Sequence, residues 1–384
     1  MPGLMLTDDL EEFRSTVAEF ARTVIAPVIA DHYERGEFPL GLVSQMADLG
    51  LFGLPFPEEI GGGGGDLLAF GVALEEIARV DSSMAITLEA AVSLGAMPIH
   101  RFGSDHQRRR WLPDLLAGRA IGAFGLTEPG GGSDAGATKT SAIMLNGDWV
   151  LNGEKCFITN AGTALTAFVV VTAVTGAAGS GRREISTILV PTGTPGLEIG
   201  GQYSKVGWRC SDTRPVALVE CAVPLDHLVG ERGRGYAQFL SILDEGRIAI
   251  AALATGLAQG CLDESVRYAQ QREAFGRPIG AHQGLAFQIA DMEARVHAAR
   301  LTWRDAAVRV SAGVAYKRQA AIAKLVSSEA AMDNARAATQ VFGGYGFMNE
   351  YPVARFYRDA KVLEIGEGTS EVQRTLIARD LGLP

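Results

Sequence analysis

Apolar residues follow a helical spacing through the N-terminal third of the chain. The first such face is made of Leu10, Phe13, Val17, Phe20 and Val24, at alternating intervals of three and four residues. Similar spacing predicts helices at about 40–50, 66–80, 83–98 and 105–117. The glycines at 61–65 predict a loop, because glycine loses more conformational entropy in a helix than any other residue. Residues 1–120 are therefore predicted to form a helical domain.

The pattern changes to short β-branched runs after residue 120. The runs at 168–174, 186–191 and 215–224 are bounded by glycine and proline, which is typical of strands. The stretch NGDWVLNGEK at 146–155 contains two Asn-Gly pairs, the strongest short signal for a β-hairpin. Residues 121–229 are therefore predicted to form a central β-domain, either barrel-like or a sandwich.

Long helical patterns return from residue 230 to the C-terminus. One apolar face is made of Leu285, Ile289, Met292, Val296, Ala299 and Trp303. No proline interrupts 237–277 or 279–351, which favours long helices in a four-helix bundle over 230–384. The predicted fold is α+β and multidomain, with the order helices, strands, helices instead of the alternating βαβ order. No GxGxxG follows a strand, so a dinucleotide is not expected to bind in the Rossmann manner.

Composition excludes several function classes. The chain has 384 residues, of which 47% are hydrophobic and 21% charged, so it can bury large cores. A net charge of −9 without a basic block argues against nucleic-acid and anionic-membrane partners. Neither a signal peptide nor an apolar run of the ~18 residues that span a membrane is visible, and a cytoplasmic location is expected. The four cysteines and six histidines show no metal-binding spacing, so no metal is expected.

One acidic side chain, Glu367, lies between Gly366 and Gly368 directly before a predicted helix. Ser370 and Gln373 form an S-x-x-Q capping box, so the helix is expected to begin at Ser370 or one residue earlier. The helix dipole favours the carboxylate, whereas apolar neighbours would raise its pKa. A strong base that is still ionised needs this balance. The alternative is a solvated glutamate in a glycine-rich turn.

Four further segments are candidates for ligand contacts. EPGGGSD at 128–134 is a loop whose N–H groups can face an anion, most plausibly a phosphate, and CFITNAG at 156–162 could pack on a planar ring. Arg272, at a helix end, could bind phosphate with its fork of donors, or could be a solvated cation. Three glycines in QVFGGYGFMNEYP, 340–352, interrupt a helical pattern and need a packing or ligand reason.

Five blocks of sequence, taken together, resemble the acyl-CoA dehydrogenase family. They are GLTEPGGGSD, NGEKCFITNAG, REAFGRPIGAHQ, QVFGGYGFMNEYPVARFYRDAKV and EGTSEVQR, in this order and at the family's distances. The resemblance covers essentially the whole chain, including the order helices, strands, helices. It implies an FAD-dependent enzyme that oxidises an acyl-CoA to the trans-2-enoyl-CoA.

The resemblance assigns expected roles to individual residues. Phe124, Leu126, Thr127, Gly132 and Ser133 match the first flavin loop, and Phe157, Ile158 and Thr159 match the segment over the isoalloxazine. Many relatives have tryptophan where Phe157 stands. Arg272, Phe275, Gln283, Gln340, Gly343 and Gly344 match positions that reach the FAD of a neighbouring subunit. Thr369 and Glu371 match FAD contacts after the catalytic loop, although some relatives have glutamine in place of Glu371.

Glu367 matches the family's catalytic base. In the implied mechanism it removes the α-proton, its backbone N–H and a flavin ribityl hydroxyl stabilise the enolate, and the β-hydride passes to flavin N5. Some relatives carry the base on the helix that contains LDEGRIAI, where this chain has Gly246, so the ordinary location is favoured. No second carboxylate is expected within reach of Glu367, and Glu245, beside Gly246, is the only nearby candidate. Asp244, Arg247, Ser133, Gly366 and Gly368 are the expected substrate contacts, although Arg247 could equally be a structural ion-pair partner.

The acyl group is expected to be short or medium in length, with room for a branch. Gly366 stands where several straight-chain enzymes have tyrosine, and 85–95 is expected to line the pocket floor, where Ala85 replaces the arginine of glutaryl-specific relatives. Glu89 in this helix has no assigned role and is expected to face solvent. Expected partners are an electron-transfer flavoprotein and three further copies, as a homotetramer built as a dimer of dimers. The alternatives are a dehydrogenase of carrier-protein-bound acyl groups, a flavin oxidase or monooxygenase, and a non-enzymatic interaction module.

Overall fold

The computed structural model describes residues 5–177 and 183–383. Its N-terminal part is helical, as predicted. The segments are α1 (Asp8–Phe20), η2 (Ala21–Ile25), α2 (Ala26–Arg35), α3 (Leu40–Asp48), η3 (Glu58–Ile60), α4 (Leu67–Ala78), α5 (Ser82–Glu89), η4 (Ala90–Ala96), α6 (Met97–Phe102) and α7 (Asp105–Leu116). Asp66 and Asp81 cap α4 and α5 through their carboxylates. The segment η4 is a π-helix that interrupts one long buried helical rod between α5 and α6.

The central part is a mixed eight-stranded sheet. Its strands are β1 (Ile121–Gly125), β2 (Ser141–Leu145), β3 (Asp148–Thr159), β4 (Thr166–Ala177), β5 (Arg183–Pro191), β6 (Leu197–Ile199), β7 (Thr213–Pro224) and β8 (Leu228–Val229). The order is β6-β7-β3-β2-β4-β5-β8, with β1 parallel to β4 outside this path. Short helices η5 (Ala135–Ala137) and η6 (Leu225–His227) lie in the connections. The three predicted β-branched runs correspond to β4, β5 and β7.

The two Asn-Gly pairs have different structures. Asn146 and Gly147 both have positive φ, 54° and 91°, and form the two-residue turn between β2 and β3, as predicted. Asn152 and Gly153 form no turn. They lie inside β3, where the pairing with β7 shifts register and a Cβ on Gly153 would lie 2.5 Å from Thr140 Oγ1. The hairpin prediction is therefore wrong for the second pair, because the glycine serves a bulge and a close approach.

The C-terminal part is a bundle of long helices. It consists of α8 (Gly235–Gln271), α9 (Gln283–Ser311), α10 (Lys317–Phe342), α11 (Pro352–Leu363) and α12 (Ser370–Asp380). A small hairpin of β9 (Glu273–Ala274) and β10 (Arg277–Pro278) with η7 (Ile279–Ala281) joins α8 to α9, and η8 (Gly343–Phe347) follows α10. Met292, Val296, Ala299 and Trp303 are fully buried, which confirms the predicted apolar face of α9.

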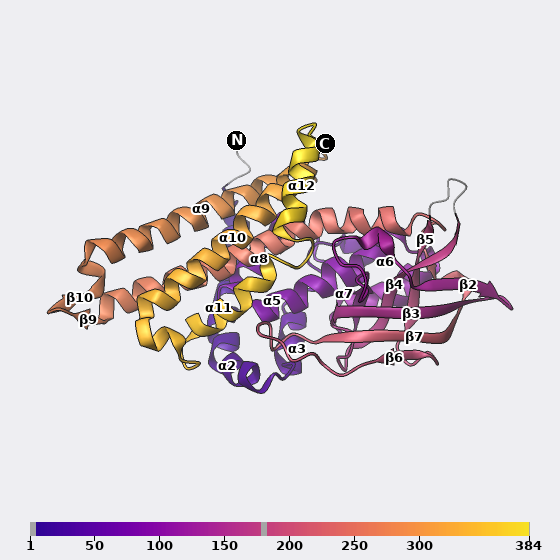
Figure 1. Ribbon diagram of the computed structural model, residues 1–384, viewed down its shortest axis with the longest axis horizontal. Coiled ribbons are helices and arrows are strands. Elements are labelled where there is room, and N and C mark those ends of the chain that lie inside the picture. The colour runs from indigo at the N-terminus through magenta and orange to yellow at the C-terminus, as the bar shows by residue number, and fades with distance from the viewer. Residues whose placement is uncertain (1–4, 178–182, 384) are drawn as a thin grey trace.

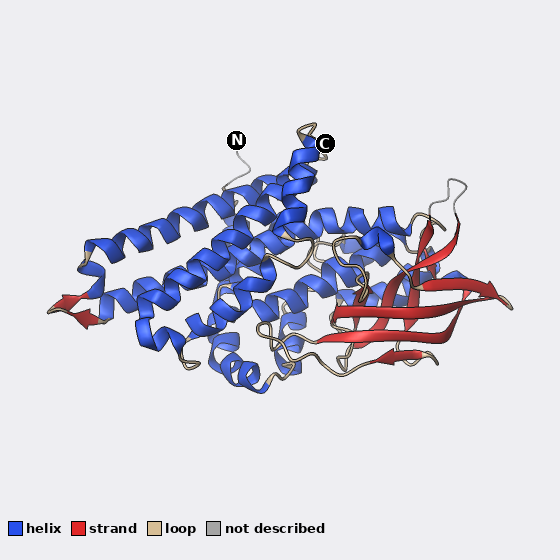
Figure 2. Cartoon of the chain, viewed as in Figure 1, coloured by secondary structure: helices blue, strands red, loops and turns tan. Residues whose placement is uncertain are grey.

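The molecule is elongated, with the sheet at one end and the β9–β10 hairpin at the other (Figure 1). The helix α8 runs from the sheet into the bundle, and the loop between α11 and α12 lies between the two ends (Figure 1). Figure 2 shows the strands of the large sheet gathered at one end, the short β9–β10 strands at the other, and helices between them. The family's order of helical, sheet and helical regions is thus present. The domain boundaries at 120 and 229 stay predictions.

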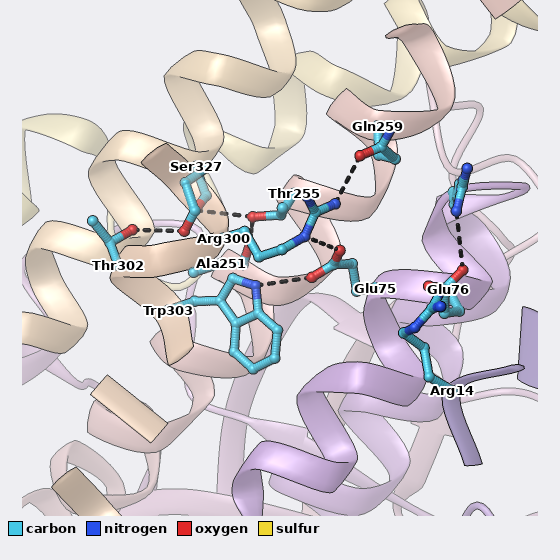
Figure 3. A network of polar contacts seen from close by, with 12 residues as sticks. Arg14, Glu75, Glu76, Ala251, Thr255, Gln259, Arg300, Thr302, Trp303 and Ser327 are labelled. Carbon is cyan, nitrogen blue, oxygen red and sulfur yellow. Dashed lines mark hydrogen bonds and ion pairs between the residues drawn. The ribbon is translucent and has the colours of Figure 1, made fainter. Parts of the chain in front are cut away.

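Buried polar contacts fasten the N-terminal helices to the bundle (Figure 3). Glu75 of α4 accepts a hydrogen bond from Arg300 at 2.7 Å and from the Trp303 indole at 3.0 Å, and Arg300 also donates to Gln259 at 2.7 Å. A Cβ on Gly71 of α4 would lie 2.6 Å from the Trp303 ring. Helices from three parts of the sequence, α4, α8 and α9, are therefore held together by these contacts.

The segment Ser82–Phe102 corrects one expectation from the sequence. By length and composition alone it is apolar enough to cross a membrane, although no such run was expected. In the fold 83% of its apolar window is buried inside the protein. Its hydrophobicity therefore belongs to a core helix, since a helix that is apolar on all sides can be buried in a large protein as well as in a bilayer.

Candidate active site

A tight turn between α11 and α12 carries Glu367. The Gly366 N–H donates to the Val362 carbonyl at 2.8 Å, and the Ser370 N–H donates to the Glu364 carbonyl at 3.0 Å. The helix α12 begins at Ser370, but its N-cap is Thr369, whose hydroxyl accepts from the Val372 N–H at 3.3 Å. The predicted capping box of Ser370 and Gln373 is therefore wrong.

Gln373 holds the turn instead of capping the helix. Its Nε2 donates to the carbonyls of Glu367 at 3.3 Å and Gly368 at 2.8 Å. Glu367 has φ of 51°, which is uncommon for a residue other than glycine, and Gly368 has φ of 91°. Strain of this kind persists only where surrounding contacts fix the backbone, and it clusters at functional sites. Only Gly368 of the two flanking glycines needs its conformational freedom; Gly366 does not have positive φ.

The Glu367 carboxylate is buried although the residue as a whole is partly exposed. Both carboxylate oxygens are inaccessible to solvent, so the solvated-loop interpretation is wrong. Burial raises the pKa of Glu367 to about 7, and the positive charges of Arg247 and Lys324 oppose this rise. A base works best when its pKa lies near the operating pH. The site therefore supplies a carboxylate of higher basicity than an exposed glutamate has.

Lys324 of α10 was not identified from the sequence. It is fully buried, and its Nζ donates to the Gly368 carbonyl at 2.8 Å. Burial lowers its pKa to about 8, against the attraction of the nearby Glu367 charge. A lone lysine in the alanine-rich helix QAAIAKLVSSEAA was the available signal. Lys324 thus anchors the turn and places a cation near the carboxylate.

The helix α8 passes directly beneath Glu367 at Gly246. A Cβ on Gly246 would lie 2.5 Å from Glu367 Oε2, so the glycine gives the carboxylate its space. Arg247 pairs with Asp244 at 2.6 Å, and Lys317 reaches Asp244 at 3.2 Å. Arg247 therefore has the structural ion-pair role that the sequence left open. Its positive charge also lowers the pKa of Glu367.

Glu245 is engaged away from the site. It forms an ion pair with Arg101 and accepts from the Tyr316 hydroxyl at 3.3 Å. The acidic neighbour of Glu367 is instead Glu89, which is fully buried at the end of α5. The expectation that Glu89 faces solvent is wrong. The signal that could have identified it was one acidic residue within the apolar run ITLEAAV.

The first group of expected flavin residues lies where β1 and β3 end. Phe124 stacks on Phe239 with ring centroids 3.6 Å apart, Leu126 and Thr127 are half-buried, and Gly132 and Ser133 are exposed. Phe157 has φ of 61° and is 66% exposed, Ile158 is buried and Thr159 is half-buried. An aromatic ring held outward on a strained strand end suits a planar ligand.

Glu128 fixes the glycine-rich loop that follows β1. Its carboxylate accepts from the N–H groups of Lys139 at 2.7 Å and Thr140 at 3.0 Å and from Lys155 Nζ at 2.8 Å. Lys155 also donates to the Leu126 carbonyl at 3.2 Å. These contacts position Thr127 and the exposed backbone at Gly132 and Ser133. Neither Glu128 nor Lys155 was singled out from the sequence.

The second group lies at the far end of the bundle, near β9 and β10 (Figure 1). Arg272, Gly343 and Gly344 line a cavity of about 560 Å³ with Tyr345 and other residues. Added Cβ atoms on the two glycines would meet nothing within 4 Å. Phe275 is 96% exposed, and Gln283 and Gln340 begin and nearly end their helices.

The two groups are separated along the molecule's long axis, so one chain does not bring them together (Figure 1). Thr369 and Glu371, the remaining expected contacts, lie at the start of α12, between these ends. The residues present fit FAD: an exposed aromatic and open glycine backbone at one end, and an arginine fork with an apolar cavity at the other. This division is compatible with a cofactor that spans two subunits.

Three family descriptions match nearly the whole chain. Residues 7–119 match the acyl-CoA dehydrogenase N-terminal domain, 123–221 the middle domain and 233–382 the C-terminal domain. Among curated proteins, the "Probable acyl-CoA dehydrogenase" of Bacillus subtilis is 47% identical over 377 residues, covering 98% of each chain. The short-chain specific acyl-CoA dehydrogenase of Clostridium acetobutylicum is 40% identical over 373 residues, covering 97% of this chain and 98% of its own.

Solved structures agree with these matches. Butyryl-CoA dehydrogenase from Megasphaera elsdenii superposes with a TM-score of 0.94 at 38% identity, over 98% of this chain and 99% of its own. A chain from the structure described as the electron transferring flavoprotein of Acidaminococcus fermentans gives 0.94 at 39% identity, over 98% of both chains. Glutaryl-CoA dehydrogenase from Mycobacterium smegmatis, in complex with FADH2, gives 0.92 at 30% identity, over 98% of this chain and 95% of its own.

Proposed function

The chain belongs to the acyl-CoA dehydrogenase family, whose members are oxidoreductases acting on CH–CH groups, and we propose that Glu367 is the base for the α,β-dehydrogenation of a short- or medium-chain acyl-CoA. The observation that carries this proposal is the buried carboxylate, with its pKa raised to about 7 by burial, on a strained and anchored turn. A fixed carboxylate with this basicity is suited to removing a weakly acidic proton. The product is the trans-2-enoyl-CoA. Fatty-acid metabolism and β-oxidation fit the family.

The family is flavin-dependent, and we propose FAD as the cofactor of this chain. When bound, FAD supplies the acceptor for the β-hydride. Phe157, Ile158 and Thr159 would lie against its ring system, and the loop fixed by Glu128 would face it with Thr127, Gly132 and Ser133. The relative that was solved with FADH2 supports this assignment. Arg272, Gln283 and the Gln340–Gly344 segment would hold the cofactor of a neighbouring subunit.

The turn would also polarise the substrate. The Glu367 N–H makes no backbone hydrogen bond within the described residues, while the carbonyls of Glu367 and Gly368 are occupied by Gln373 and Lys324. The N–H is thus available to the thioester carbonyl. One preorganised donor of this kind typically contributes about 3–4 kcal/mol to the transition state. The same turn would therefore supply both the base and a donor to the enolate oxygen.

The acyl group we propose is short or medium in length, and a branch is also compatible with it. Short-chain specific and butyryl-CoA relatives support the length. Gly366 meets only the Val362 carbonyl at 3.5 Å, so its side-chain direction is otherwise open. Arg247 and Asp244 form a buried pair beside Glu367, and we propose that they border the substrate with Ser133, Gly366 and Gly368.

We propose a homotetramer that passes electrons to an electron-transfer flavoprotein in the cytoplasm. The structural relative from Acidaminococcus fermentans supports such a partner. The separation of the two flavin groups and the exposed aromatics Phe275, Phe287 and Phe347 support assembly through the bundle. Four free, buried cysteines are compatible with a reducing compartment. Light scattering that finds a flavin-saturated monomer would contradict this assembly.

A panel of acyl-CoAs tests the function directly. Purified protein is expected to be yellow, and anaerobic addition of its substrate is expected to bleach the flavin. The panel contains straight acyl-CoAs from four to twelve carbons, branched acyl-CoAs and the same groups on an acyl carrier protein, which separates the CoA reading from the carrier-protein alternative. If no acyl thioester bleaches the flavin, the proposed function is wrong.

A further inference from the structure

Glu89 is a second buried carboxyl group beside Glu367. It is the last residue of α5, where the α-helix gives way to the π-helix η4, and it is 0% exposed. π-Helical turns inside α-helices are rare and frequently mark functional sites. Nothing in the proposed reaction uses Glu89. Burying an acidic residue without an ion-pair partner costs free energy, so the position of Glu89 needs a physical explanation.

The two carboxyl groups lie within reach of a shared hydrogen bond. None of their four oxygens has a well-formed hydrogen bond among the described residues, and besides Glu367 only the Ser93 hydroxyl there lies close enough to Glu89 to act on it. Acceptor-only groups cannot satisfy each other unless one of them carries a proton. A buried pair of carboxyls therefore holds one proton, since two adjacent anions in a low dielectric repel strongly.

The surrounding charges decide which group carries the proton. Arg247 of α8 and Lys324 of α10 both act on Glu367 and favour its ionised form. Around Glu89, burial and the charge of Glu367 raise the pKa well above its ordinary value, and the only opposing group is the neutral hydroxyl of Ser93 in η4. Glu245 is turned to Arg101, and Asp244 to Arg247 and Lys317. The cations thus favour a charge on Glu367, and the proton stays on Glu89.

We propose that Glu89 is a positioning residue for the base: its carboxyl group keeps a proton and donates it in a hydrogen bond to the carboxylate of Glu367. This inference rests on the proposed function, in which Glu367 is the base. The bond orients the Glu367 carboxylate and keeps it ionised in a site from which water is excluded. Hydrogen bonds to an ionised acceptor are shorter and stronger than those between neutral groups.

During the reaction Glu89 neither gains nor loses a proton. The α-proton passes from the substrate carbon to the Glu367 carboxylate, and the electron pair of the broken C–H bond passes into the enolate of the thioester. Glu367 is then neutral beside a neutral Glu89, so no like-charge repulsion develops. Because Glu89 donates more strongly to the ionised form, it lowers the basicity that burial alone would give Glu367.

Two substitutions separate this role from its alternatives. Glu89→Gln keeps a donor of the same shape but cannot ionise, and Glu89→Leu keeps the volume but removes the donor. Flavin content and circular dichroism establish that each variant is folded. The measurement is the rate of anaerobic flavin reduction by the best acyl-CoA as a function of pH.

The midpoint of this pH profile is expected to remain near the wild-type value in Glu89→Gln. In Glu89→Leu it is expected to rise by roughly one pH unit or more, because a hydrogen bond to the charged form is lost. If Glu89 were ionised, removing its charge would lower the midpoint in both variants. A lowered midpoint in Glu89→Gln, or an unshifted one in Glu89→Leu, would overturn the proposal.

Infrared difference spectroscopy of the protein without substrate provides a second readout. At a pH well above 7, where Glu367 is ionised, wild type is expected to show the carbonyl stretch of a buried protonated carboxylic acid, and Glu89→Gln is expected to lose it. Absence of this band from wild type, or its persistence in the variant, contradicts the proposal even if Glu89→Leu does not fold. Wild-type flavin that no acyl-CoA reduces would instead count against the proposed function, whatever the infrared result.

Discussion

Substitution of Gly246 by alanine tests whether the space beneath Glu367 is needed for catalysis. The added Cβ would lie 2.5 Å from Glu367 Oε2 and 3.2 Å from its Cδ. Ordinary van der Waals contact begins at about 3.4 Å, so the carboxylate oxygen must move by about 0.9 Å. Oε2 is the end of a flexible side chain, and the backbone need not follow.

The consequences for stability and for catalysis are expected to differ. Alanine in the interior of α8 favours the helix by roughly 0.5–1 kcal/mol over glycine, so the melting temperature should stay equal or rise slightly. A misplacement of about 1 Å in a catalytic group can cost about 10²-fold in rate. Gly246→Ala should therefore retain flavin and fold while losing roughly this factor in flavin reduction.

Stopped-flow reduction by the best acyl-CoA, together with thermal unfolding, measures both effects. Gly284→Ala is the matched control, because that glycine lies in the first turn of α9 and its added Cβ would meet nothing within 4 Å. The control should keep the wild-type rate. A Gly246→Ala variant that reduces at the wild-type rate would refute the view that Glu367 acts from this position.

Three further predictions follow from the charges and space around the turn. The rate of flavin reduction at low substrate concentration should rise with pH through about 7, because only ionised Glu367 is a base. Lys324→Met should move the midpoint of this rise to higher pH, because it removes a cation that lowers the pKa of Glu367, and an unchanged or lower midpoint would contradict this. Because the pKa of Glu367 is raised in the folded protein, its contribution to stability is present below the unfolded pKa of about 4.5 and is lost as pH rises through about 7. In pH-dependent melting, Glu367→Gln should therefore be more stable than wild type at pH 8, by at most about 3 kcal/mol, and should show no such gain at pH 4. Gly366→Tyr should reduce kcat/KM for branched acyl-CoAs more than for straight ones, and equal losses would show that position 366 does not face the acyl chain.

Periodic patterning was sufficient to predict the architecture. The spacing from Leu285 to Trp303 and the β-branched runs of β4 and β5 directly reflect which faces are buried, so the helices and strands followed from the sequence. The second Asn-Gly pair failed because local turn propensity at Asn152 and Gly153 is overridden by the pairing of β3 with β7. Rules based on local sequence do not take the pairing with a neighbouring strand into account.

The candidate site was predicted only in part. Glu367 was found because it lies in a recognisable segment, but its pKa depends on Arg247 and Lys324, which come from two other helices. Glu89 is far from Glu367 in sequence, and the two carboxyls come together only because α5 packs against α8 and α11 in the fold. A single charge within an apolar helix marks such a site, yet the sequence alone does not identify the group that it faces.

Stopped-flow reduction of the Glu367→Gln variant tests the central claim most directly. Glutamine keeps the volume and the turn, so folding and flavin content should survive and an acyl-CoA should still bind and perturb the flavin spectrum. Reduction should fall by at least about 10²-fold, the lower end of what a positioned base supplies. Glu245→Gln, whose side chain is engaged with Arg101, is the control and should remain active. Reduction at the wild-type rate in the Glu367 variant, together with loss of reduction in the Glu245 variant, would contradict the account by placing the base on α8.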